Sequence, residues 1–287
     1  MTEQIIKTIL VLSAAGGCLA LFFFVLKPVF SRLFGNAFRF YMWLLVFVLL
    51  LAPARIDFKS IPPKQPMAGG VEITANIDGE KTAPAQENAV TARENKPETA
   101  EKAAESRGAR LPRLNGWDIL FFAWLLGVCL FLLLGGISYV RFLRKIYKES
   151  EPISCPTAEN VRQKLHIRRA FSVRRANFKT PPLMIGLFRP ILLLPDRHFS
   201  ESEQSSILLH ELTHFKRFDL WYKWLAFLAN AVHWFNPLVY LAVRQMQISC
   251  EFSCDEAATR SMNDQEKKEY MRTILKLTEQ REDEKHV

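Results

Sequence analysis

The sequence predicts a mainly α-helical membrane protein with several spans, joined to a small α+β domain that carries a metal site. Three observations predict this fold class. Hydrophobic residues make up 49% of 287 positions and gather in long apolar runs. Basic residues follow these runs, as expected for loops on the cytoplasmic side of a membrane. An H-E-x-x-H motif follows a region of strand-like sequence in the second half of the chain.

The segment 1–52 is predicted to form two transmembrane helices with a short cytoplasmic loop between them. Residues 8–26 are uncharged and long enough to cross a hydrocarbon core about 30 Å thick. A signal peptide is the alternative, but the apolar run continues without a polar break. A second apolar run covers residues 37–52. The loop between the runs is basic, so the positive-inside rule places it in the cytoplasm and the N-terminus outside.

Residues 53–116 differ in composition from the apolar runs, because they are rich in Pro, Ala, Glu, Lys, Asn and Thr. Such a segment cannot bury enough apolar surface to offset its ordering entropy. We therefore expect a largely disordered, low-complexity loop on the outer side of the membrane. A sensing role and a simple linker are both open for this loop, and its composition favours the linker.

A third transmembrane helix is predicted over residues 117–140. Four basic side chains follow it directly, at positions 141, 144, 145 and 148. By the positive-inside rule they place the rest of the chain in the cytoplasm, in agreement with the first basic loop. The predicted protein is therefore a multi-pass membrane protein.

Residues 141–287 are predicted to form the cytoplasmic domain. A short helix is expected over residues 160–166, and strands are expected at 171–173 and within 182–195, where Pro and Gly mark the ends. Strands just before a metal-binding helix suit a peptidase, since an edge strand can pair with the extended backbone of a substrate.

A helical hairpin that associates with the membrane is predicted over residues 220–243. This stretch is apolar but carries Lys, Asn and His, so it is a poor span for direct contact with lipid. The hairpin is expected to break near Asn236 and Pro237. The tail, residues 260–287, is expected to form a charged amphipathic helix with a frayed end.

The H-E-x-x-H motif consists of His210, Glu211 and His214, within a predicted helix. One helical turn is about 3.6 residues, so the two histidines share a face and can bind one metal ion. Zn²⁺ is the expected metal, and Glu211 stands where zinc peptidases keep the carboxylate that takes a proton from water. Ser200 and Glu203 form a predicted capping box at the start of this helix.

A third ligand is needed, because H-E-x-x-H also occurs on surface helices that bind no metal. A zinc site for hydrolysis uses three protein ligands and leaves one position open for water. Glu251, in a second predicted helix, completes this set with His210 and His214. Asp255 follows one helical turn later and is expected to orient one of the histidines.

His233 is a candidate catalytic residue in the predicted hairpin. A histidine there can polarise the substrate carbonyl or stabilise the oxyanion that forms during hydrolysis. A structural histidine with satisfied hydrogen bonds is the alternative.

The five cysteines indicate no disulfide framework, because their number is odd and their positions are scattered. Cys250 and Cys254 flank Glu251 at helical spacing, which is compatible with a soft-metal site. Small buried thiols are the simpler interpretation. The net charge of +9 is explained by membrane topology and contact with anionic lipid, so direct binding of nucleic acid is not expected.

Four stretches together resemble the integral-membrane zinc peptidases of the M56 family, which includes the antibiotic-sensing signal transducers of BlaR1/MecR1 type. They are Gly186–Pro195 (GLFRPILLLP), His210–Trp221 (HELTHFKRFDLW), His233–Tyr240 (HWFNPLVY) and Cys250–Glu256 (CEFSCDE). The resemblance covers most of the chain outside residues 53–116. It implies a gluzincin-like domain with zinc on His210, His214 and Glu251, Glu211 as general base and then acid, and Asp255 in a supporting role.

What the resemblance implies for function is regulated proteolysis on the cytoplasmic side, of the protein itself or of a transcriptional repressor. The expected partners are a peptide or protein substrate, a cytoplasmic repressor as the candidate substrate, the lipid bilayer, and a second copy in a candidate homodimer. Known members carry a fourth span and an external penicillin-binding sensor after the protease, whereas this sequence ends before either. A β-lactam response therefore does not follow from the resemblance.

Two other functions remain open. A membrane quality-control protease of the HtpX type would use the same H-E-x-x-H and E-x-x-x-D pattern with broad specificity. A non-catalytic signalling or scaffold protein would use a closed structural zinc site, with Cys250 or Cys254 as a fourth ligand. The intact Glu211 argues against a structural site, which has no use for a base.

Overall fold

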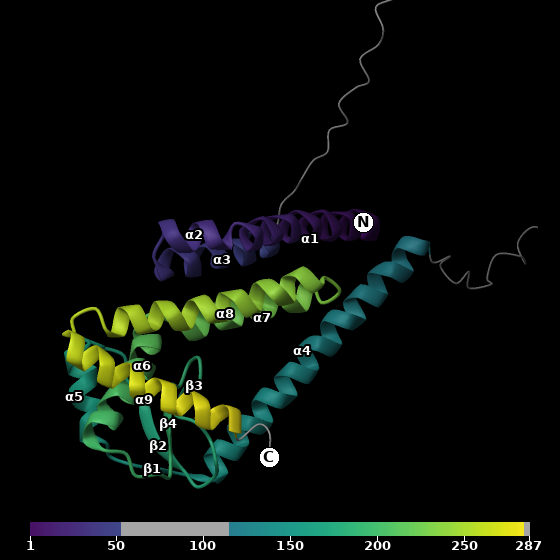
Figure 1. The fold of residues 1–287 in the computed structure, drawn as a ribbon. Helices are drawn as coiled ribbons and strands as arrows, with labels where there is room; N and C mark the ends of the chain where they lie inside the picture. Colours follow the sequence, from purple (N-terminus) through teal and green to yellow (C-terminus); the bar gives the residue numbers. More distant parts are fainter. Residues whose placement is uncertain (53–114, 284–287) are drawn as a thin grey trace, which may run out of the picture. The chain divides into compact units, whose positions relative to one another are not determined.

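The computed structural model of the protein describes residues 1–52 and 115–283 (Figure 1). The predicted outer loop therefore lies outside the described residues, except for its last two positions. The described part is mostly helical, with one small sheet.

Three apolar helices occupy the three predicted spans. Helix α1 covers Thr2–Val25, α3 covers Asn36–Leu51 and α4 covers Gly116–Lys148, while a short helix α2, Lys27–Leu33, lies in the basic loop. By length and composition α1 and α4 can cross a membrane. Helix α3 has 16 residues, which extend about 24 Å at about 1.5 Å per residue, less than a hydrocarbon core of about 30 Å.

Helix α4 is longer than predicted, because it continues through the basic residues that follow the apolar run. Asn115 and Asp118 form a capping box at its start. Lys and Arg are good helix formers, so nothing in this segment ends the helix before Lys148. The most apolar window of α4 has none of its residues buried inside the protein, against 33% for α1. An apolar helix surface that the protein leaves uncovered is expected to face lipid.

The predicted helical hairpin is present as α7, Asp219–Val232, and α8, Pro237–Ala258. The break falls where expected, because the side chain of Asn236 accepts a hydrogen bond from the amide of Leu238 at 2.9 Å and Pro237 occupies the first helical position. Helix α8 runs well past residue 243, the predicted end of the hairpin.

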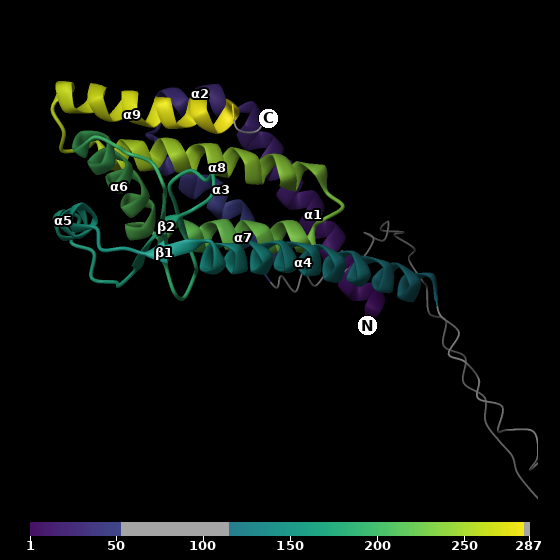
Figure 2. The same cartoon turned by 90° about the horizontal axis from the view of Figure 1, so that it is seen from below.

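The turn of this hairpin is anchored to two of the apolar helices. The Asn236 side-chain amide donates to the carbonyl of Ser13 on α1 at 3.0 Å. The indole of Trp124 on α4 donates to the carbonyl of Val232 at 2.8 Å. Figure 2 shows α7 running beside α4. The hairpin also shares a buried apolar core with α1 and α3, formed by Ala20, Phe40, Trp43, Phe47, Ala226, Val239 and Met246 among others.

The sheet has four short strands in the order β1-β2-β4-β3, with β2 and β4 parallel and the other pairs antiparallel. The predicted strand region 182–195 divides into two strands because Gly186 turns the chain in a left-handed conformation, at φ +92°. Among the described residues, strand β3 pairs with β4 alone and therefore forms an edge of the sheet. The strands cover Ser150–Pro152 (β1), Ser172–Ala176 (β2), Leu183–Ile185 (β3) and Ile191–Pro195 (β4).

Three further helices complete the domain: α5 (Pro156–Lys164), α6 (Glu201–Lys216) and α9 (Asp264–Asp283). Helix α5 begins four residues earlier than expected, with Pro156 in its first turn.

The predicted capping box of α6 is confirmed, since the Ser200 hydroxyl accepts from the amide of Glu203 at 3.2 Å and the Glu203 carboxylate accepts from the amide of Ser200 at 3.1 Å. Helix α6 packs against β3, α5, α8 and α9. Its apolar side is buried with the sheet, through Leu192, Leu194, Leu208, Leu212 and Phe215. A helix held on so many sides keeps its side chains in fixed positions.

Candidate metal centre

The structure brings the three predicted metal ligands together. His210 and His214 project from the same face of α6, and their Nε2 atoms lie 3.2 Å apart. Glu251 reaches them from α8, with its Oε2 atom 3.1 Å from Nε2 of His214 and 3.5 Å from Nε2 of His210. The contact between α6 and α8 is therefore what assembles the ligand set.

The spacing of these three atoms fits a zinc ion. Zinc binds nitrogen and oxygen ligands at about 2.0–2.2 Å in a tetrahedral arrangement, which sets neighbouring ligand atoms about 3.3–3.6 Å apart. The observed distances of 3.1, 3.2 and 3.5 Å are within about 0.2 Å of this range, close to the edges of one face of such a tetrahedron. Two imidazoles and one carboxylate are also the ligands of known catalytic zinc sites.

Each histidine is held by a carboxylate through its other ring nitrogen. Asp255, as predicted, lies with Oδ1 3.0 Å from Nδ1 of His210. Asp219 lies with Oδ2 2.7 Å from Nδ1 of His214. These contacts orient both rings so that the Nε2 atoms face each other and Glu251.

Asp219 and Tyr270 are supporting residues that the sequence analysis missed. The Tyr270 hydroxyl on α9 donates to Oδ1 of Asp255 at 2.8 Å and lies 2.9 Å from Nδ1 of His210. Asp219 follows His214 by five positions, so helical periodicity alone would not place it there. It reaches His214 because the chain reverses at Phe218, which adopts a left-handed conformation with φ +62°. The sequence signal for Tyr270 is weak, since it is one tyrosine in a charged helix.

Glu211 lies beside the ligand atoms but makes a separate contact. Its Oε2 atom accepts a hydrogen bond from the backbone amide of Met184 on the edge strand β3, at 3.1 Å. The carboxylate therefore lies between the edge strand and the histidine pair, where it can reach a substrate backbone and a water molecule.

Strong charge coupling within the cluster shifts its pKa values. Burial opposes protonation of His210, but the hydrogen bonds with Asp255 and Glu251 outweigh it and raise the pKa of His210 to about 10. The pKa of His214 is also raised well above its ordinary value, where the contact with Asp219 outweighs burial. Burial opposes ionisation of Glu251, but the two histidines hold its pKa well below its ordinary value. Without a metal ion, the Glu251 carboxylate thus lies ionised beside two imidazoles that favour protonation, and a metal ion would bind by replacing their protons.

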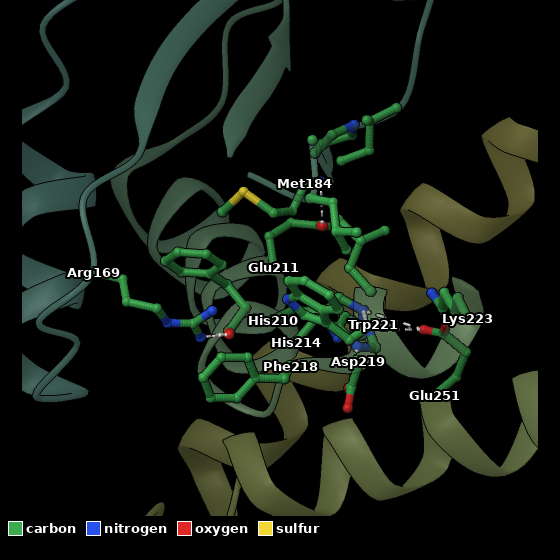
Figure 3. A pocket seen from close by; sticks show the side chains of 16 residues that line it. Arg169, Met184, His210, Glu211, His214, Phe218, Asp219, Trp221, Lys223 and Glu251 are labelled. Atoms are coloured by element: carbon green, nitrogen blue, oxygen red, sulfur yellow. Dashed lines mark hydrogen bonds and ion pairs between the residues drawn. The ribbon is translucent and has the colours of Figure 1, made fainter. Parts of the chain in front are cut away.

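A pocket of about 180 Å³ opens onto these groups (Figure 3). Met184 and the edge strand lie on one side, and residues of α6 and α7 lie on the others. Lys223 of α7 lies near Glu251, with its Nζ atom 3.4 Å from Oε1. Because Oε2 faces the histidines, this ion pair occupies the other oxygen of the same carboxylate.

His233 occupies a different place from the one proposed for it. Its side chain is 0% exposed, and its Nε2 atom lies 3.1 Å from the carbonyl oxygen of Leu50 on α3. It is not among the residues that line the pocket. The structure thus supports a structural histidine that ties the hairpin turn to α3, but its hydrogen bonds are not all satisfied, because Nδ1 is buried without a partner among the described residues.

Both Cys250 and Cys254 are buried next to the histidines. Donor atoms of His210, His214 and Cys254, and those of His214, Cys250 and Glu251, lie within 4.8 Å of one another. The thiol of Cys254 donates to the carbonyl of His210 at 3.5 Å, which uses its proton in a structural contact. The His/His/Glu set has shorter separations and is the better zinc site.

Comparison with known proteins identifies the family of the chain. A family model described as BlaR1 peptidase M56 matches residues 7–287. The chain is 30% identical over 168 residues to the regulatory protein BlaR1 of Bacillus licheniformis, which covers 56% of this chain and 28% of that protein. It is 25% identical over 273 residues to the methicillin resistance mecR1 protein of Staphylococcus aureus and to that of Staphylococcus epidermidis, covering 89% of this chain and 43% of those proteins. The chain therefore spans less than half the length of these relatives.

Proposed function

Because the chain belongs to the M56 peptidase family, of BlaR1/MecR1 type, we propose that it is a membrane-embedded zinc metalloendopeptidase of gluzincin type. In this proposal the protein crosses the bacterial cytoplasmic membrane with the N-terminus outside. The three apolar helices are the spans, and residues 141–287 form the peptidase domain on the cytoplasmic side. The names of the relatives, a regulatory protein and methicillin resistance proteins, support a role in signal transduction.

One observation carries the proposal: three candidate ligand atoms, from two histidines on α6 and one carboxylate on α8, lie 3.1–3.5 Å apart, and a second carboxylate, Glu211, is free of that set and faces the edge strand. A purely structural zinc site has no use for a carboxylate in that position. The combination of three ligands with an adjacent base is the arrangement of hydrolytic zinc enzymes.

The chain's own residues supply the remaining chemistry. A zinc ion bound at this set would polarise the scissile carbonyl and lower the pKa of water. Glu211 is placed to accept the proton of the attacking water and to deliver it to the leaving amine. The edge strand β3 offers backbone groups to an extended substrate, since β3 pairs with β4 on one side only. The amide of Met184, which now donates to Glu211, shows that this free side faces the site.

The substrate of the proposed reaction is a polypeptide. Regulated cleavage of the protein itself, of a second copy in a homodimer, or of a cytoplasmic transcriptional repressor fits a membrane peptidase in a signalling role.

The test compares the wild type, Glu211→Ala and Glu251→Ala, each purified as the full chain in detergent. About one zinc per chain is expected in the wild type and in Glu211→Ala, and loss or strong weakening of binding is expected in Glu251→Ala. Cleavage of the chain itself or of added polypeptide should occur only in the wild type. Cleavage by Glu211→Ala would remove Glu211 as the base, and full zinc retention by Glu251→Ala would remove Glu251 as a ligand.

A non-catalytic protein with a structural zinc site is the second candidate, because Cys250 and Cys254 lie close to the histidines. X-ray absorption at the zinc edge separates the two. Nitrogen and oxygen ligands alone at about 2.0–2.2 Å support the peptidase, and a sulfur ligand at about 2.3 Å supports the structural site.

A further inference from the structure

Arg169 lines the pocket on the side of the histidine pair opposite Lys223 and Glu251 (Figure 3). It lies between strand β2 and helix α5 in the sequence and reaches the end of α6. Two aromatic rings hold its guanidinium group, whose central carbon lies 4.0 Å from the ring centre of Phe215 and 3.6 Å from that of Phe218. The guanidinium also donates to the carbonyl of Phe215.

Within the part of the chain that the structure describes, Arg169 pairs with no carboxylate. Its only hydrogen bond there uses one of five N–H donors. Partial burial lowers the pKa of Arg169, and no carboxylate among the described residues offsets this effect. A desolvated cation with free donors at the wall of a pocket gains from an incoming carboxylate.

The second cation of the pocket differs in this respect. Lys223 is paired with Glu251, one of the ligand residues, with 3.4 Å between Nζ and Oε1. Its charge is therefore already balanced inside the site. Of these two basic side chains in the pocket, Arg169 is the one without a carboxylate partner among the described residues.

We propose that Arg169 is a specificity-determining residue that binds a carboxylate of the substrate, so that the site takes polypeptides with an Asp or Glu near the bond to be cut. This inference rests on the proposed function, because it assigns the substrate class of the same pocket. The planar guanidinium, stacked between two rings, presents its edge for a two-point contact with a carboxylate.

Arg169 also packs against Phe215 and Phe218, and the test must separate this structural role from binding of a substrate carboxylate. The rings of Phe215 and Phe218 flank the reversal between α6 and α7, and Phe218 there has the uncommon φ of +62°. This reversal places Asp219 against His214. Loss of Arg169 could therefore weaken the metal site without any role in substrate choice.

The experiment measures which peptides the site binds, independently of cleavage. The full chain carrying Glu211→Gln, purified in detergent, loaded with zinc and immobilised, is offered a synthetic library of degenerate short peptides. Retained peptides are sequenced. Enrichment of Asp and Glu at one position by about 10-fold or more is expected, from the strength of hydrogen bonds between charged groups. The enrichment should vanish when Arg169→Gln is added and persist when the exposed neighbour Arg168→Gln is added.

Zinc content of each variant is measured in parallel. If Arg169 acts only on the reversal, Arg169→Gln lowers zinc content and total peptide retention but leaves the composition of the retained peptides unchanged. That result overturns the inference, as does a library retained without acidic enrichment or not retained at all. Cleavage of the retained peptides by the wild type tests the proposed function separately. Peptides that bind through Arg169 but are never cut would contradict the peptidase and leave the recognition of acidic residues standing.

Discussion

Asp219 on α7 holds the imidazole of His214 on α6, with 2.7 Å between its Oδ2 atom and Nδ1 of the ring. The carboxylate is 1% exposed and also faces Arg217, whose Nε lies 3.4 Å from Oδ1. His210 has the same kind of support from Asp255 on α8. The imidazoles of the two candidate ligands are thus oriented from two different helices, and the candidate site forms only when α6, α7 and α8 are packed together.

Asp219→Asn should weaken zinc binding by about 10- to 100-fold, the usual effect of losing a carboxylate behind a metal-bound histidine. The amide retains the size of the side chain but removes the charge that aligns His214. Competition with a zinc chelator of known affinity measures the change. Asp196→Asn, a surface substitution, is the control. Equal affinities for Asp219→Asn and the wild type would mean that Asp219 serves folding alone.

Tyr270→Phe should lower thermal stability and weaken zinc binding severalfold. The buried hydroxyl donates to the Asp255 carboxylate at 2.8 Å, and hydrogen bonds to charged groups contribute about 1.5–3 kcal/mol. The measurements are the melting temperature and the chelator competition, with the exposed Tyr147→Phe as the control. A variant that melts and binds zinc like the wild type would show that α9 does not support the metal site.

The metal-free protein should lose stability as the pH rises from about 6.5 to about 10. His210 has a folded-state pKa of about 10, above its ordinary value of 6.5. The folded protein therefore binds more protons than the unfolded chain between these values, and this contribution to stability is complete below pH 6.5 and lost as the pH approaches 10. Thermal unfolding after removal of metal measures the slope, and His210→Gln should flatten it. A slope unchanged in His210→Gln would assign the effect to other groups.

Zinc uptake should depend on pH in the opposite direction. Metal can replace the protons on His210 and His214 only by releasing them, so affinity should increase with pH over the same range. Proton release on zinc addition, recorded in a weakly buffered solution at two pH values, checks this expectation. Uptake without proton release would contradict the raised pKa values.

His233→Ala should reduce stability without altering catalysis by the folded, zinc-loaded protein. The ring is fully buried and its Nε2 contacts the carbonyl of Leu50, so its loss leaves that carbonyl unpaired at a cost of about 1–3 kcal/mol. Activity per bound zinc should equal that of the wild type, as in the exposed control His198→Ala. A loss of activity by orders of magnitude with full zinc content would restore the oxyanion role.

Helical periodicity made much of this site predictable. The spacing of His210 and His214 places both rings on one face whatever the helix packs against, and the capping residues mark where that helix begins. The break at Asn236 was predictable from local sequence as well, because Asn as N-cap followed by Pro in the first turn favours the start of a new helix. Glu251 was chosen by chemical type and motif, and its approach to the histidines required a three-dimensional contact between α6 and α8.

The residues that support and surround the candidate ligands could be identified only from the tertiary structure. Asp219 reaches His214 only because Phe218 reverses the chain in a conformation that sequence rules do not assign to phenylalanine. Tyr270 and Arg169 lie at the site although their segments carry no local sequence sign of metal or substrate binding. His233 lies outside the pocket, where its side chain contacts the carbonyl of Leu50. Local sequence was enough to predict most of the helices, the apolar runs and the candidate ligand residues, because these depend on neighbours one turn apart. Contacts between distant segments depend on how whole helix surfaces pack, and only the folded chain specifies them.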